Sequence, residues 1–200
     1  MALTKAGAEV QNFTAVASLA VDSSTVVDCA DNYETSLHIQ AAVDASGTAT
    51  HDGTKFIVQV SASTTGDEDW ANYAEFTALE GTLIDEALTA EATAPTKTLP
   101  STAHDLLVEG VWNLLRDATL ANSEMIFIQE LDTDDVNIVD NIARTHAATT
   151  TDIRNIAMVR HVTIQGTNIL RARLLVDNRL DPNAINVVFR LSKTVTTLLS

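Results

Sequence analysis

The sequence predicts an all-β protein, an antiparallel β-sandwich that carries a small inserted β-rich module. Three observations favour this fold class. The apolar residues recur mostly at every second position, as they do in half-buried strands. Thr, Val, Ala and Ile dominate the chain, and the β-branched residues among them favour strands. Finally, Pro95 and Pro100 fall within six residues of each other and indicate a crossing into a different structural unit.

The first half of the chain predicts two regular strands and one irregular one. Residues 35–43 alternate, with Leu37 and Ile39 on one face and polar residues on the other. Residues 55–61 alternate in the same way after a turn-forming His-Asp-Gly sequence. In residues 70–76 the aromatic residues stand three apart, which suits a helical turn or a bulged strand, and the surrounding strands favour the bulged strand.

The second half predicts the inserted module and the return of the sandwich. Residues 81–94 read as an edge strand or a linker, and residues 105–116 fit a short amphipathic helix when taken alone. Asp181-Pro182-Asn183 is expected to form a turn, since the proline fixes its own backbone dihedral and the flanking side chains bond local backbone. The remaining predicted strands cover residues 124–130, 136–139 (after a hairpin turn at 132–135), 158–164, 168–176 and 184–191.

These elements predict a division of the chain into two units with separate cores. The predicted segments are an N-terminal arm (1–12), the sandwich (13–95 and 153–192), the module (96–152) and a C-terminal tail (193–200). The sandwich core is predicted to contain Leu37, Ile39, Val58, Val60, Leu174, Val187 and Phe189. The module core is predicted to contain Leu114, Ile126, Ile128, Val136 and Ile138.

Composition excludes several classes of function. Twelve basic residues against 27 acidic ones give a formal charge of −15, and this field repels nucleic acid. No apolar run approaches the roughly 20 residues that span a bilayer, and the N-terminus lacks the pattern of a secretory signal, so we expect neither membrane insertion nor export. Cys29 is the only cysteine, which rules out an intrachain disulfide and predicts a buried thiol.

Several stretches of the chain resemble β-sandwich structural proteins of tailed bacteriophages. In their usual pattern a strand ending in V-x-x-S is followed by a polar loop and a tryptophan, as in residues 53–63 and 66–70. Further similar stretches are 33–39, 76–78, 120–128, 136–139, 143–147, 170–178 and 187–190. The resemblance spans roughly residues 15–192. It implies a virion structural protein assembled in the host cytoplasm, most concretely a capsid decoration or cement protein that binds the major capsid protein.

The sequence carries no recognisable catalytic or cofactor signature. The nucleophile-elbow, zinc-protease, phosphate-loop and dinucleotide-binding motifs are all absent, so we expect no enzyme and no cofactor. The five histidines have no ligand-like spacing and are expected to be exposed or structural. The acidic stretches 67–69 and 132–135 suit either calcium or, more readily, solvated turns. Trp70 and Tyr73 suggest a sugar-stacking platform, although core packing is the stronger interpretation.

Four arginines on the terminal strands are the candidate subunit-interface residues, namely Arg160, Arg171, Arg173 and Arg190. They pair either with acidic patches on a neighbouring virion subunit or with acidic residues of this chain. The hypotheses are therefore a homo-oligomeric capsid decoration protein, a neck or tail component, or a carbohydrate-binding β-sandwich.

Overall fold

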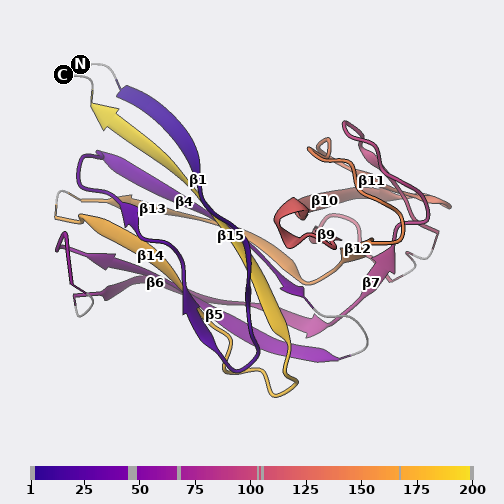
Figure 1. The fold of residues 1–200 in the computed structure, drawn as a ribbon, viewed down its shortest axis with the longest axis horizontal. Helices are drawn as coiled ribbons and strands as arrows, with labels where there is room; N and C mark the ends of the chain where they lie inside the picture. The colour runs from indigo at the N-terminus through magenta and orange to yellow at the C-terminus, as the bar shows by residue number, and fades with distance from the viewer. Residues whose placement is uncertain are drawn as a thin grey trace.

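The structure, a computed structural model, describes residues 3–44, 49–66, 69–102, 104, 106–166 and 168–198. These residues form antiparallel sheets and one short 3-10 helix, which confirms the all-β prediction. Figure 1 shows two bodies, with both chain ends on the larger one, at the side away from the smaller one. No helix among the described residues is long and apolar enough to cross a membrane.

The larger body is a sandwich of two sheets. The first sheet has the order β1 (Leu3–Val16), β15 (Asn186–Leu198), β4 (Glu34–Asp44) and β13 (Ala157–Gln165). The second has the order β2 (Val21–Ser23), β14 (Arg171–Asp177), β5 (Thr50–Ser61) and β6 (Ala71–Thr82), and β3 (Val27–Asp28) also pairs with β14. All of these strand pairs are antiparallel.

The sandwich core follows from the period-two pattern of its strands. Every second residue of β4 and β14 is buried, so one face of each strand packs into the space between the sheets. All seven predicted sandwich residues belong to this cluster, with Val60 at its partly buried margin. Fully burying one such aliphatic or aromatic side chain contributes about 1.5–3 kcal/mol. Cys29 lies in the same cluster as a buried free thiol, as predicted.

The strand β6 is bulged, as the aromatic spacing predicts. Val58 pairs with Ala74 and Gln59 with Asn72, so Tyr73 is the extra residue on β6. The tyrosine is 42% exposed, which makes the core interpretation wrong for it. Its hydroxyl donates to the Thr163 carbonyl of β13 at 3.0 Å and so joins the edges of the two sheets.

The smaller body, hereafter the module, is one curled sheet. Its strands have the order β7 (Asp85–Ala87), β12 (Thr151–Arg154), β9 (Trp112–Asp117), β10 (Glu124–Leu131), β11 (Asp135–Ile138) and β8 (Thr98–Pro100), and the 3-10 helix η1 covers Leu120–Asn122. The backbone N–H of Thr89 donates to the Pro100 carbonyl at 2.9 Å, and Ser101 Oγ donates to the Ala87 carbonyl at 3.3 Å. These bonds bring the two end strands together.

Three features of the predicted division differ from the structure. Strands β7 and β12 belong to the module sheet, so its boundaries lie near residues 84 and 155. Residues 3–12 and 193–198, predicted as arm and tail, lie within the paired strands β1 and β15. Both segments are held by backbone pairing, and most side chains of residues 3–12 are exposed, so that segment lacks the apolar alternation that marks a strand. Residues 106–111 are not helical, and 112–117 form β9.

The two units have separate cores that meet at a small junction. The predicted module residues cluster together except Leu114, which packs instead with Phe13, Ala42 and Val188 of the sandwich. The junction also carries charge, because Asp44 of β4 accepts from Arg116 at 2.8 Å and from Arg154 at 3.3 Å.

Candidate subunit interface

Two of the four predicted interface arginines lie together on the face of β14 opposite the core. The guanidinium carbons of Arg171 and Arg173 lie 4.8 and 4.3 Å from the centre of the Trp70 ring, as in cation–π contacts. Arg171 also donates to the carbonyls of Ser63 and Gly66 at 2.6 and 2.9 Å. Trp70, which precedes β6, therefore stacks with two guanidinium groups, and these groups occupy ring surface that a sugar would need.

The other two arginines lie apart from this pair. Arg190 forms an ion pair with Glu9 of β1 at 2.7 Å. Arg160 is exposed on the edge strand β13 and donates to the neighbouring Val159 carbonyl at 3.2 Å. The structure therefore brings Arg171 and Arg173 together but forms no single arginine patch. Their role at a subunit interface stays a prediction.

The acidic stretch 132–135 forms the predicted hairpin turn. The backbones of Asp132 and Asp135 bond each other at 2.9 and 3.4 Å, and the Asp132 carboxylate accepts from the Thr133 N–H at 2.7 Å. This carboxylate therefore stabilises the turn itself. In the other acidic stretch, Asp67 and Glu68 lie outside the described residues. Among the described residues no three His, Cys, Asp or Glu side chains group together as a metal site.

Three histidines are buried, and two of them have carboxylate partners. In the sandwich, His51 Nδ1 contacts the fully buried Asp181 carboxylate, and its Nε2 lies 3.0 Å from Thr54 Oγ1. Asp181 also accepts from the Asn183 N–H at 2.7 Å, which confirms the predicted turn. This histidine therefore ties the 181–183 turn to β5.

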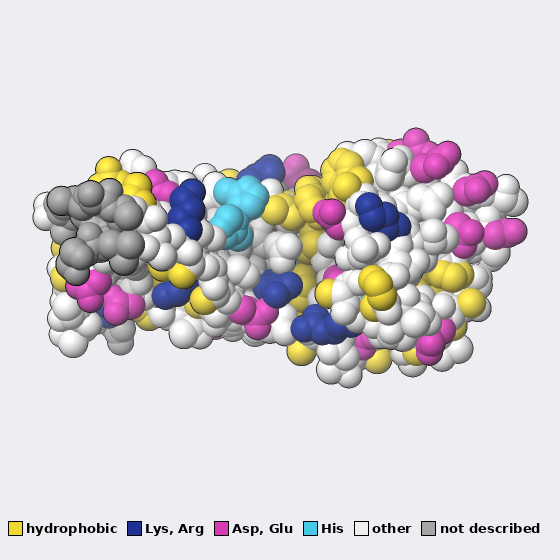
Figure 2. All heavy atoms as spheres, turned by 90° about the horizontal axis from the view of Figure 1, so that it is seen from above, with side chains coloured by type: hydrophobic (Ala, Val, Ile, Leu, Met, Phe, Trp, Pro, Cys, Tyr) yellow, Lys and Arg dark blue, Asp and Glu magenta, His cyan; other side chains and the backbone are white. Residues whose placement is uncertain are grey.

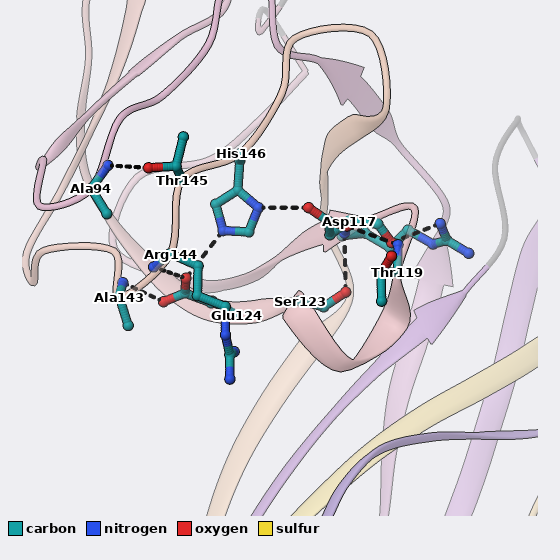
Figure 3. Close-up of polar contacts among 10 residues, drawn as sticks. Ala94, Asp117, Thr119, Ser123, Glu124, Ala143, Arg144, Thr145 and His146 are labelled. Atoms are coloured by element: carbon teal, nitrogen blue, oxygen red, sulfur yellow. Dashed lines mark hydrogen bonds and ion pairs between the residues drawn. The ribbon is translucent and has the colours of Figure 1, made fainter.

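In the module, His146 lies between two carboxylates (Figure 3). Its Nδ1 lies 3.1 Å from Asp117 Oδ2, and its Nε2 lies 3.1 Å from Glu124 Oε1. Ionised carboxylates accept hydrogen bonds only, so both contacts are made when both ring nitrogens donate, which is the imidazolium form of the ring. The Glu124 carboxylate also accepts the backbone N–H groups of Ala143 and Arg144, each at 2.8 Å.

Burial and hydrogen bonding act on these groups in opposite directions. Burial lowers the pKa of His146, but the hydrogen bonds and charges of Glu124 and Asp117 outweigh it and raise this pKa above its ordinary value. Burial raises the pKa of Glu124, but the bonds from His146, Ala143 and Arg144 leave this pKa below its ordinary value. The His146 side chain is fully buried, so the arrangement is suited to holding the module together.

An apolar surface that is not predicted from the sequence lies where the two units meet. Leu106, Val108 and Val111 are 63%, 60% and 41% exposed and line a groove with Trp112 of the module and Ile156, which leads into β13. Figure 2 shows hydrophobic side chains gathered between the two bodies. The run of apolar residues around the buried Leu107 was the only sequence signal for this surface. Such a short run does not indicate which of its side chains are packed against the rest of the chain and which stay exposed.

Comparison with known proteins finds only weak structural similarity. No protein-family profile matches the chain, and no curated protein sequence matches it. Among solved structures, VP17, a capsid protein of bacteriophage P23-77, is 10% identical, with 99% of this chain and 98% of that chain covered and a TM-score of 0.22. The complex of VP16 and VP17, the two major capsid proteins of the same phage, is 12% identical, with 96% and 99% covered and a TM-score of 0.21. At these TM-scores the likeness carries no argument about this chain.

Proposed function

We propose that this chain is a non-enzymatic structural subunit of a tailed-phage virion, most concretely a capsid decoration protein that binds the major capsid protein. The observation that carries the proposal is the exposed apolar surface of Leu106, Val108 and Val111. Exposed contiguous apolar surface beside a groove is typical of protein–protein contact. The resemblance of the sequence to β-sandwich structural proteins of tailed phages indicates that the assembly is a virion.

The polar centres of the chain agree with a structural role. His51 and His146 are buried and engaged by carboxylates of the same chain. Arg171 and Arg173 cover Trp70, which disfavours the carbohydrate-binding alternative. In this proposal the groove at the junction receives an apolar segment of a neighbouring virion subunit, and the arginines lie at other contacts.

The test is to purify particles on a density gradient and quantify this chain by mass spectrometry against the major capsid protein. The proposal expects the chain to remain with intact particles through high salt. Copy number then separates the alternatives, because hundreds of copies per particle indicate the capsid and a dozen or fewer indicate the neck or tail. A chain recovered only from the soluble fraction of lysed cells contradicts the proposal.

A further inference from the structure

Two histidines face each other on the outer surface of the sandwich. His38 of β4 and His161 of β13 are directly opposite in the strand register, and their ring centres are 4.6 Å apart at an interplanar angle of 80°. Figure 2 shows one cluster of histidine side chains on the face in view. The cluster belongs to this pair, because His51, His104 and His146 are buried.

The Nδ1 atoms of the two rings point toward each other. The Nδ1 atoms of His38 and His161 lie 2.5 Å apart, so one of them carries the proton that the other accepts. Two neutral imidazole nitrogens that converge in this way are the ligand type preferred by zinc, copper and nickel. A tetrahedral ion with bonds of about 2.0–2.1 Å requires the two nitrogens about 3.3 Å apart. A small rotation of the exposed His161 ring away from the half-buried His38 ring therefore makes room for the ion.

Two features of its surroundings favour the neutral His38 ring with a free lone pair on Nδ1. Its Nε2 lies 3.0 Å from Thr194 Oγ1 of β15, and an N–H donated to this hydroxyl leaves the lone pair on Nδ1. Burial, and then the neighbouring His161, lowers the pKa of His38, which favours the neutral ring. The outer position of the pair leaves the remaining coordination sites to water.

We propose that His38 and His161 form a two-histidine site for a divalent transition-metal ion, in which both Nδ1 atoms bind the ion and Thr194 orients the His38 ring. On binding, the proton on His161 Nδ1 is replaced by one on its Nε2 through exchange with water, so both rings bind as neutral imidazoles and no net proton is released. This inference is independent of the proposed function.

The test is calorimetric titration of the whole chain with Zn²⁺ and with Ni²⁺ at pH 7.5. We expect one ion per chain, and at least tenfold weaker binding in His38→Ala and in His161→Ala. Ser36 and Thr163, a hydroxyl pair 3.2 Å apart on the same two strands, provide the matched control, since Ser36→Ala and Thr163→Ala change no imidazole. Binding to these controls should stay within twofold of the parent chain.

A second measurement guards against variants that simply misfold. Zn²⁺ should raise the melting temperature of the parent chain and of both control variants, but not of His38→Ala, whose metal-free melting temperature should stay close to that of the parent. Electron paramagnetic resonance of the Cu²⁺ complex should show two nitrogen ligands. Absence of binding up to about 1 mM ion overturns the inference, because a site that is weaker than this would add little to the stability of the fold. Binding that survives both histidine substitutions also overturns it.

Discussion

At the scale of single residues, His146 links three parts of the module that are far apart in the sequence. It joins the 141–146 segment to Asp117 at the end of β9 and to Glu124 at the start of β10. The sequence predicts exposed or structural histidines, and this one is structural. Its partners are not predictable from the sequence, because acidic residues 22 and 29 positions away are brought to one imidazole only by strand pairing.

This centre gives the module a stability that depends on pH. The raised pKa of His146 means that its contribution is complete below the unfolded value of about 6.5 and is lost as pH rises through the folded value. The lowered pKa of Glu124 means that its contribution is complete above about 4.5 and is lost as pH falls through the folded value. We expect the unfolding free energy of the module to be greatest between these limits. Urea unfolding from pH 4 to 9 measures this, and a free energy that rises steadily from pH 6 to 9 contradicts it.

Removal of the imidazole should destabilise the module strongly. In His146→Ala, Asp117 and Glu124 lose the positive charge between them, and uncompensated buried charges typically cost about 3–5 kcal/mol. The variant should also lose the decline in stability above pH 6.5 that the parent chain shows. Arg160→Ala is the control, because this exposed side chain bonds only the adjacent backbone and surface changes usually stay within about 0.5 kcal/mol. Equal stability of the two variants in urea would refute the assigned role of His146.

At the scale of elements, the period-two pattern predicted the strands whose inner faces are buried, such as β4, β5 and β14. It missed β1, whose first seven described residues are all exposed. That strand is held by its backbone pairing with β15, and a side-chain pattern carries no trace of such pairing. The module boundaries shifted for a related reason, since β7 and β12 are three and four residues long and too short to show alternation.

The module should be removable because the chain enters and leaves it at one place. Asn155 Nδ2 donates to the Thr82 carbonyl at 2.9 Å, and Asn155 Oδ1 accepts from the Ile84 N–H at 2.7 Å. Replacement of residues 84–155 by a short Gly/Ser linker should leave a soluble sandwich with one cooperative melting transition. Some loss of stability is expected, because Ala42 and Val188 become exposed when Leu114 of the module is removed. Aggregation or a missing transition contradicts the independence of the two units.

The ion pairs of Asp44 should fix the angle between the two units. This carboxylate is 13% exposed and is shared by Arg116 and Arg154, so Asp44→Ala removes both contacts and leaves two guanidinium groups together. We expect a loss of about 1–2 kcal/mol, less than for a fully buried pair. Small-angle scattering should show a broader range of shapes, while the amide spectra of each unit stay near those of the parent. The exposed pair of Lys55 and Glu75 is the matched control, and an equal effect of Glu75→Ala contradicts the prediction.

At the scale of the whole molecule, the all-β class was predictable from composition and periodicity, whereas the apolar groove was not. Of the four arginines predicted for a subunit interface, Arg171, Arg173 and Arg190 have partners within the chain, and their interface role stays a prediction. The apolar groove emerges only when the module docks on the sandwich, because its walls come from both units. Surface of this kind depends on three-dimensional proximity, which one sequence does not encode in a readable pattern.

A symmetry-averaged electron-microscopy reconstruction of the native particle would test the proposed role as a capsid decoration protein most directly. We expect the two-body shape of this chain on the outer surface of the capsid in hundreds of copies, with Leu106, Val108 and Val111 covered by a neighbouring subunit. A particle that lacks this shape, or one in which the three side chains remain exposed to solvent, contradicts the proposed function.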